Sequence, residues 1–173
     1  MISSAIQVSS SDTAGEQGFD VTVGSDTGRL FTLALSILRD EGEAQDAVQE
    51  TLVRAWRSWA SLSRTDHVSP WLTRVCVNYC ISRRRYLRSR GWPQLQMSEL
   101  ARSRGDASSS AQNVDMDRAY RRLSLKQRAA IALTYGYGYT DEESAALMGC
   151  RPGTVRTHVA RALATLRKEL GDA

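Results

Sequence analysis

The chain has 173 residues, of which 42% are hydrophobic and 24% are charged, and these proportions are typical of a folded globular protein. No apolar run approaches the roughly 20 residues that a membrane-spanning helix needs, and the N-terminus lacks the basic and apolar segments of a secretory signal. We therefore expect a cytoplasmic protein without a membrane partner, and the odd number of cysteines, three, does not indicate a disulfide framework.

The net charge of +4 is unevenly distributed along the chain. Residues 1–63 hold nine acidic and four basic residues, residues 64–113 hold three and nine, and residues 114–173 hold seven and ten. Nearly all of the bases are arginine, whose planar guanidinium can bind phosphate and guanine through two parallel hydrogen bonds. The middle and the end of the chain therefore indicate surfaces for a polyanion, and the acidic front indicates a different partner, such as a basic protein surface.

Residues 1–25 are rich in Ser, Thr, Gly and Asp, and we expect a disordered tail. Apolar residues at helical spacing then predict helices over residues 26–39 and 43–59, the second with a buried stripe that ends at Trp56 and Trp59. The exposed early face of the second helix is acidic and polar, and no lysine or arginine is close by to pair with its acids. Because acids early and bases late suit the helix dipole, this charge order also has a purely structural explanation.

A polar loop over residues 61–68 precedes a third helix, which we expect to begin with Ser69 as its cap and Pro70 at its first position. Trp71 is interpreted as core. Cys76 and Cys80 lie one turn apart in the apolar stripe, so burial explains them better than a zinc site. The helix ends in an arginine-rich run, residues 83–90, with five arginines in eight residues. Like charges at this spacing destabilise an isolated helix, so the run indicates an anionic partner.

Residues 94–113 are typical of a flexible linker, and we predict a boundary there between domains at 26–93 and 114–173. The second domain begins with a short helix, followed by a helix that Ser124 and Gln127 open as a capping box. Residues 135–139 are expected to form a loop. No strand and no repeat is predicted, so the fold class is all-α, with two small helical domains.

The stretch from residue 140 to 168 predicts a helix–turn–helix. Thr140 and Glu143 have capping-box spacing, Gly149 is suited to end the first helix, and Pro152 is suited to start the second. Four residues of the second helix share a short polar face: Thr154, Thr157, His158 and Arg161. A helix–turn–helix places such a face in the major groove of DNA. The alternative is a helical hairpin whose second helix merely has a solvated face.

Motifs of catalysis are absent from the sequence, which has no phosphate-binding glycine loop, no HExxH and no nucleophile elbow. Asp46 with Glu50 could be viewed as paired carboxylates, but acids near a helix start more often serve the helix itself. The two histidines, His67 and His158, are far from the cysteines, which disfavours a zinc site. We therefore expect no enzymatic activity, no metal and no cofactor.

Taken together, the two halves resemble a bacterial extracytoplasmic-function (ECF) sigma factor, the small two-domain type of the sigma-70 family, over residues 26–90 and 114–170. In the first half, DAVQETLVRAWRSW (residues 46–59) resembles region 2.2, and PWLTRVCVNYCISRRR (residues 70–85) resembles regions 2.3 and 2.4. The segment from residue 123 to 167 resembles region 4, including G-T-V and R-A. The arginine bias and the V-N-x-x-I-S-x-x-R form are similar to actinobacterial members.

The resemblance implies three surfaces. The first would dock on the β′ coiled coil of core RNA polymerase through Asp46, Gln49, Glu50 and Arg54. The second would melt and hold the −10 element through Arg64, His67, Asn78, Ser82, Arg83, Arg84, Arg85 and Arg88. The third would read the −35 element through Arg151, Thr154, Arg156, Thr157, His158 and Arg161.

Further partners implied by the resemblance are promoter DNA, the β flap of the polymerase and an anti-sigma factor, with no small-molecule substrate. Three positions depart from the usual pattern: Ser82 replaces a frequent aspartate, Arg151 replaces a frequent capping serine, and Ser144 replaces a larger residue, which should loosen packing. The alternative function is a stand-alone helix–turn–helix transcriptional regulator. An RNA-processing or nuclease-like helical enzyme is a third hypothesis, for which the chain lacks metal ligands and an acid–base pair.

Overall fold

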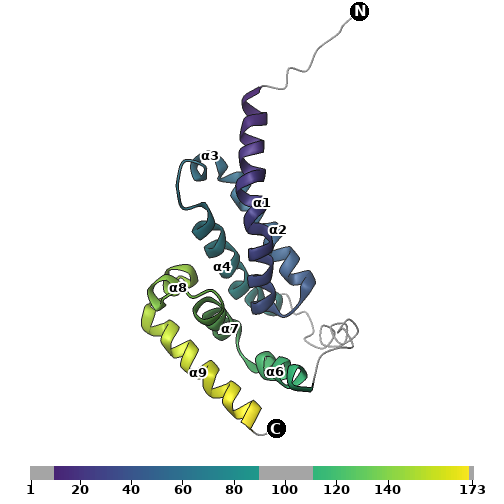
Figure 1. Cartoon of the computed structure of the whole chain (residues 1–173), viewed down its shortest axis with the longest axis vertical. Helices are drawn as coiled ribbons and strands as arrows, with labels where there is room; N and C mark the ends of the chain where they lie inside the picture. The colour runs from purple at the N-terminus through teal and green to yellow at the C-terminus, as the bar shows by residue number, and fades with distance from the viewer. Residues whose placement is uncertain (1–9, 90–110, 172–173) are drawn as a thin grey trace, which may run out of the picture.

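The computed structural model describes the backbone of residues 10–89 and 111–171, and the side chains of residues 18–82 and 115–171. The first half contains helices α1 (Ser10–Leu38), α2 (Glu41–Arg57), α3 (Trp59–Leu62) and α4 (Val68–Ser89) (Figure 1). The second half contains α6 (Ala111–Arg122), α7 (Leu125–Ile131), the π-helical segment η2 (Ala132–Gly136), α8 (Asp141–Met148) and α9 (Pro152–Gly171). The described residues contain no strand, so the predicted all-α fold is confirmed.

Helix α1 begins far earlier than the sequence predicts. The expectation of a disordered tail over residues 1–25 is wrong from Ser10 onward, because that part of the chain continues α1. The reason is tertiary: Phe19 lies edge-on between Trp56 and Trp59, at 5.2 and 5.1 Å between ring centroids, and Val23 is 2% exposed. Aromatic pairs of this geometry add to the burial of apolar area, and they hold a segment whose composition alone is helix-poor.

The core of the first half is formed by α1, α2 and α4. Helix α2 is capped by Asp40, whose carboxylate accepts a hydrogen bond from the Glu43 backbone N–H at 2.8 Å. The helix ends at Arg57 rather than at residue 59, and α3 follows after one residue. Cys76 and Cys80 are fully buried in this core, as predicted. The hydrogen bond with Cys76, together with burial, raises the pKa of the Cys80 thiol, which therefore stays protonated.

Local sequence signals set the helix boundaries of the second half. Both capping boxes form: Ser124 pairs with Gln127 at the start of α7, and Thr140 pairs with Glu143 at the start of α8. Gly149 ends α8 in the left-handed conformation, with φ of 64°. The loop predicted over residues 135–139 is shorter than expected, because η2 continues the helix to Gly136.

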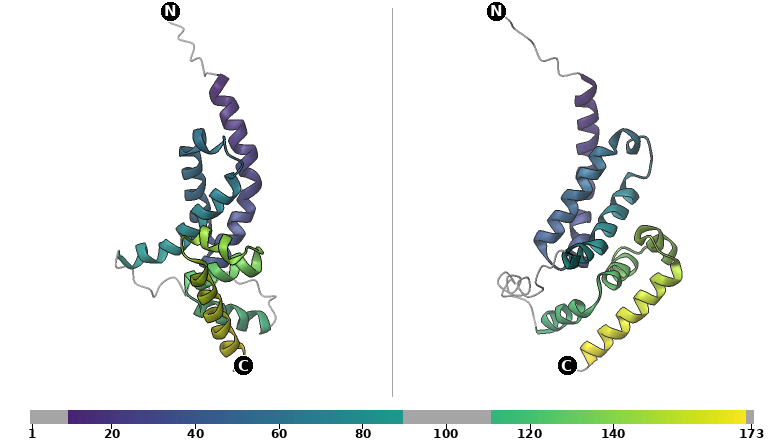
Figure 2. Two further views of the ribbon diagram at one scale, coloured as in Figure 1. Left: turned by 90° about the vertical axis from the view of Figure 1, so that its left-hand side faces the viewer. Right: turned by 180° about the vertical axis from the view of Figure 1, so that it is seen from behind.

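The two halves pack directly on one another, with α4 against α8 and α1 against α7 (Figure 2). One continuous apolar cluster joins them, since it includes Leu72 and Val77 of α4 together with Leu147 and Met148 of α8. The predicted linker over residues 94–113 lies mostly outside the described residues, and residues 111–113 belong to α6. The described helices include none that is long and apolar enough to cross a membrane.

Candidate nucleic-acid and protein interfaces

The predicted docking face on α2 is open to solvent. Asp46, Gln49 and Arg54 are exposed, and Glu50 is half-buried. The expectation that the acids of this face lack a nearby base is wrong for Glu50, because its carboxylate accepts a hydrogen bond from Arg54 Nε at 2.8 Å, one helical turn away. An exposed ion pair at this spacing contributes only about 0.3–0.5 kcal/mol to the stability of the helix. Both side chains therefore remain available to another protein.

Two apolar residues beside this face were not predicted to be accessible. Trp56, which the spacing placed in the buried stripe, is 50% exposed, and Val53 is 39% exposed. Phe19 of α1 holds the Trp56 ring edge-on. A fixed, partly exposed tryptophan flanked by polar side chains is the composition that interface centres favour. Only the position of Phe19 in space reveals this feature, and the spacing along α2 does not.

The first group of predicted −10 residues lies where α3 turns into α4. Arg64 and His67 are both exposed in this turn. The prediction that Ser69 caps the next helix is wrong, because α4 already begins at Val68. The Ser69 hydroxyl instead accepts a hydrogen bond from Arg29 at 2.7 Å and donates one to Asp26 at 3.0 Å. The turn is thereby fixed to α1, while the side chains of Arg64 and His67 remain open to solvent.

The remaining −10 residues lie on α4. Ser82 is exposed, and its hydroxyl donates to the Tyr79 carbonyl at 3.0 Å. Asn78 is half-buried, and its amide donates to the Arg74 carbonyl at 2.8 Å and to the Leu147 carbonyl of α8 at 3.0 Å. The side chains of the four predicted arginines lie outside the described residues, although the α4 backbone extends through them: Arg83, Arg84, Arg85 and Arg88.

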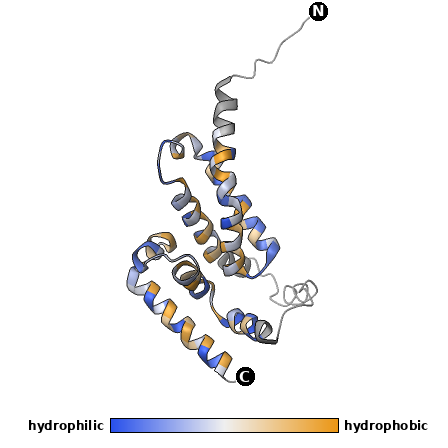
Figure 3. Cartoon of the chain, in the orientation of Figure 1, coloured by the Kyte–Doolittle hydropathy of each residue, from blue (hydrophilic) through white to orange (hydrophobic). Residues whose placement is uncertain are grey.

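Helix α9 presents the predicted recognition face to solvent. Arg151, Thr154, Thr157 and Arg161 are all exposed, at intervals of three or four residues, which places them on one side of the helix. Figure 3 shows hydrophilic and hydrophobic positions interleaved along α9, as expected for a helix with one packed and one open side. The packed side includes Val155 and Ala162, both fully buried. The arrangement fits insertion into a major groove.

Arg156 and His158 differ from the other predicted −35 residues. Arg156 lies off the main face and forms an ion pair with Asp141 of α8 at 3.4 Å, which links the two helices of the helix–turn–helix. His158 is half-buried, and this burial, together with the charges of Lys126 and Arg161, lowers the pKa of its imidazole. The free protein therefore holds a neutral His158 at pH 7.

Ser144 of α8 is fully buried, and its hydroxyl has no hydrogen-bond partner among the described residues. The expectation that this small residue loosens the packing is incomplete: a full loss of exposure indicates close packing, whereas the unpaired hydroxyl is a destabilising feature. The described residues contain no group of three or more histidine, cysteine or acidic side chains placed to hold a metal ion.

Two helical domains, the second ending in a helix–turn–helix whose last helix has an exposed polar face, have the architecture of a DNA-binding protein. Comparison with known families gives the same division. Residues 23–92 match Sigma-70 region 2, and residues 114–166 match Sigma-70, region 4.

Individual relatives agree with this match. The ECF RNA polymerase sigma factor SigM of Mycobacterium tuberculosis is 32% identical over 143 residues, which cover 83% of this chain and 72% of SigM. The RNA polymerase sigma-E factor of Streptomyces coelicolor is 31% identical over 146 residues, covering 82% and 79% of the two chains.

Among solved structures, the sigma factor RpoE in complex with the anti-sigma factor NepR from Bartonella quintana has a TM-score of 0.65 and 27% identity, covering 88% of this chain and 96% of RpoE. CnrH in complex with the cytosolic domain of CnrY shares the fold, with a TM-score of 0.59, 23% identity, and coverage of 91% and 90%. The chain belongs to the sigma-70 family, as a small two-domain sigma factor of the ECF type. It is a factor for promoter-specific transcription initiation.

Proposed function

We propose that this protein binds core RNA polymerase through the α2 face and selects promoters through two separate DNA surfaces. The observation that carries the proposal is the coexistence, on one short chain, of an open acidic docking face (Asp46, Gln49 and Glu50) and an open recognition face on α9. A regulator that acts alone needs the second face and has no use for the first.

On α2, we propose that the polar side chains surround an apolar centre formed by Val53 and Trp56. Carboxylates are steered toward a basic partner surface at long range, while a rigid aromatic side chain supplies most of the affinity at short range. The partner inferred from the family is the β′ coiled coil of the polymerase. The β flap is the inferred partner of the second domain.

On α4 and the preceding turn, the proposed −10 surface combines cations for phosphates with Asn78 as a hydrogen-bonding group for an unstacked base. An amide can both donate to and accept from a base edge. Arg64 and His67 are exposed at one end of this surface, and the arginine-rich end of α4 lies at the other. Binding through such cations should weaken as salt is raised.

On α9, the proposed −35 surface combines the cations Arg151 and Arg161 with the hydroxyls of Thr154 and Thr157. Arginine recognises guanine by two hydrogen bonds, and threonine can contact thymine through its methyl group. Arg156 serves chiefly to join α8 to α9 and is a secondary phosphate contact. His158 is proposed to contact a phosphate at the edge of this surface.

The experiment that tests the function is reconstitution with core polymerase on a library of genomic fragments from the source bacterium, followed by mapping of transcript 5′ ends. The expected result is a set of defined start sites that share −35 and −10 sequences. Start sites without shared elements, or no transcripts above core polymerase alone, would exclude the proposal. Tight operator binding without polymerase would favour a stand-alone regulator.

We also propose that an anti-sigma factor is a physiological partner. The support is the likeness to RpoE, whose structure was solved in complex with an anti-sigma factor. The test is whether the product of a neighbouring gene forms a stable complex with this chain and prevents its binding to core polymerase. A complex that leaves polymerase binding unchanged would argue against this role.

A further inference from the structure

The turn between α3 and α4 carries two of the proposed −10 residues, yet it has little packing of its own. Residues 63–67 are exposed at every position, Arg64 and His67 included. On the α3 side, the turn follows the buried Leu62, which is 6% exposed. On the α4 side, the His67 carbonyl accepts from the Trp71 backbone N–H at 3.0 Å. The position of the turn therefore depends on how its two ends are held.

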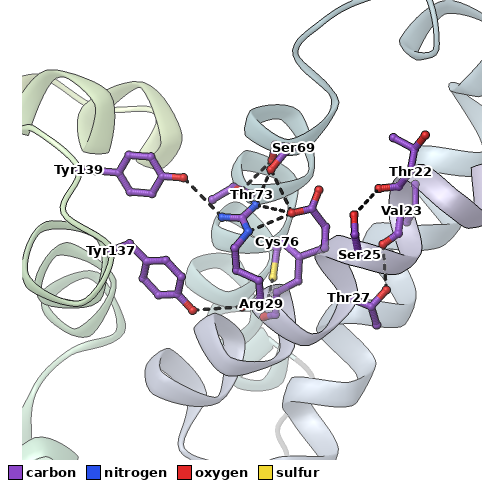
Figure 4. A network of polar contacts seen from close by, with 12 residues as sticks. Thr22, Val23, Ser25, Thr27, Arg29, Ser69, Thr73, Cys76, Tyr137 and Tyr139 are labelled. Carbon is purple, nitrogen blue, oxygen red and sulfur yellow. Dashed lines mark hydrogen bonds and ion pairs between the residues drawn. The ribbon is translucent and has the colours of Figure 1, made fainter.

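A ring of hydrogen bonds holds the α4 end of this turn to α1 (Figure 4). The Asp26 Oδ1 atom accepts from Arg29 Nε and from the Ser69 hydroxyl, both at 3.0 Å. The Arg29 Nη2 atom donates to the hydroxyls of Ser69 and Thr73, at 2.7 and 2.8 Å. The Thr73 hydroxyl closes the ring, since it donates to the Ser69 carbonyl at 2.8 Å. The ion pair of α1 thus fixes both the side chain and the backbone of Ser69.

The Asp26–Arg29 pair is not needed merely to join the two helices. Helices α1 and α4 share an apolar core cluster that includes the fully buried Leu30 and Leu72. The side chains of the pair are only 28% (Arg29) and 14% (Asp26) exposed, and the burial of two charges costs free energy that their attraction often only offsets. Replacement of such a pair by apolar side chains is often neutral or stabilising. Stability alone therefore does not explain the pair.

The pair instead supplies a fixed geometry. A guanidinium is planar and its N–H groups point in fixed directions, so its acceptors must take up defined positions around it. Burial alone would lower the pKa of Arg29, but the hydrogen bond and the charge of Asp26 raise it above its ordinary value, so the guanidinium stays charged. His67 is two residues from Ser69, at most about 7 Å along the chain. A fixed Ser69 therefore leaves the backbone of His67 little freedom.

We propose that Asp26 and Arg29 are positioning residues for the −10 element, which hold the turn before α4 in the conformation that binds DNA. Helix α1 itself has no proposed contact with DNA, and the inference rests on the proposed function of Arg64 and His67. Without the ring, the exposed turn would sample other conformations and lose part of its preference for the −10 sequence. Binding of core polymerase and recognition of the −35 element would be kept, because the pair lies on neither of those surfaces.

The experiment compares a test variant with two controls in the full chain. The test variant, Asp26→Ala/Arg29→Met, removes both charges together and should stay folded, because neither charge is left unpaired. The first control, Asp115→Ala/Arg118→Met, makes the same changes in an exposed ion pair of the same i,i+3 spacing on α6. Arg29 also donates to the Tyr139 hydroxyl of the second half at 3.5 Å, and the second control, Tyr139→Phe, removes this contact and keeps the ring.

Hydrogen exchange, followed by mass spectrometry on the free protein, measures how firmly the turn is held and does not depend on any role in transcription. Peptides that cover residues 62–71 should exchange about fivefold faster in the test variant than in the wild type, which is the effect of one lost hydrogen bond of ordinary strength. Both controls should exchange at the wild-type rate in these peptides.

Abortive transcription by the holoenzyme then measures the preference for matched over mutated −10 and −35 elements, on a promoter mapped with the wild-type protein. A loss of fold lowers transcription from all promoters alike, whereas a misplaced turn lowers only the −10 preference. We expect the test variant to lose about tenfold in −10 preference and nothing in −35 preference or in affinity for core polymerase. If the test variant unfolds, Ser69→Ala, which breaks the ring without a change of charge, should show the same pattern at smaller size.

Unchanged exchange over residues 62–71 in the test variant would overturn the inference, and so would an unchanged −10 preference or an equal fall in both preferences. If Tyr139→Phe has the effects of the test variant, the contact with the second half holds the turn, and the assignment to Asp26 and Arg29 is wrong. These results leave the proposed function standing when the wild-type holoenzyme initiates at shared −35 and −10 elements. A wild-type holoenzyme that does not do so would refute the proposed function, and the positioning role with it.

Discussion

Reversing the charge of Glu50 separates the docking role of α2 from its structural role. In the folded protein, Glu50→Lys loses one exposed pair with Arg54 and places two cations one turn apart. Each effect is worth about 0.3–0.5 kcal/mol, so the free energy of unfolding should fall by about 1 kcal/mol at most. The melting temperature should fall by about 2–4 °C, and the variant should remain folded.

The same substitution should have a far larger effect on polymerase binding. Removing one partner of a charge pair that is buried in an interface costs about 2–5 kcal/mol, which corresponds to a thirtyfold to several thousandfold loss of affinity. The assay is competition of unlabelled variant against labelled wild-type protein for core polymerase, at two salt concentrations. Glu41→Lys is the control, because this exposed residue in the first turn of α2 makes the same change of net charge about 13 Å along the helix.

If Glu50→Lys binds polymerase as well as the wild type, or if Glu41→Lys loses as much affinity, the assignment of the docking face is wrong. The second result would mean that polymerase senses only the overall charge of the first half.

Three further predictions concern the helix–turn–helix. Thr157→Ala and Arg161→Ala should each weaken use of the −35 element by about 1–3 kcal/mol per base contact. The measurement is abortive transcription from promoters with matched and mutated −35 sequences. Equal losses of transcription on both promoters would contradict a role of these residues in recognising the −35 sequence. Because the pKa of His158 is lowered in the free protein, while nearby phosphates favour its protonated form, DNA binding should take up a proton, and affinity should rise as the pH falls from about 8 to about 6. His158→Gln should flatten this dependence, and a slope that survives the substitution would exclude His158 as its source. Ser144→Ala should raise the free energy of unfolding by about 1 kcal/mol because it removes an unpaired buried hydroxyl. Ser36→Ala should not raise it, because the hydroxyl that is lost there is bonded to the Leu33 carbonyl at 2.7 Å. Urea denaturation with equal midpoints for both variants would contradict this reasoning.

The features that the sequence predicts best are those whose causes are local. Thr140 and Glu143 bond across three residues, as do Ser124 and Gln127, and Gly149 takes up the left-handed conformation that its position requires. Such interactions need no knowledge of the rest of the fold. The exposed face of α9 follows in the same way, because its packed side is defined by spacing alone.

The features that the sequence misses depend on contacts between distant segments. The start of α1 is stabilised by Phe19 against two tryptophans nearly forty residues away, and the same contact leaves Trp56 half-exposed beside the docking face. Asn78 is bonded to a carbonyl 69 residues further along the chain. Helical periodicity identifies Asn78 as polar and accessible on its own helix, but it contains no information about which other helix covers that face.

The recognition face of α9 is too small to act alone. It offers a few side chains worth about 1–3 kcal/mol for each good base contact, and the Thr157 hydroxyl already donates to the Gly153 carbonyl at 2.8 Å. Specific DNA-binding proteins reach affinities of about 10⁻⁸ M or better, which corresponds to about 11 kcal/mol and requires more contacts than this helix can make. Tethering to the polymerase makes the second binding event intramolecular and supplies the missing affinity as effective concentration.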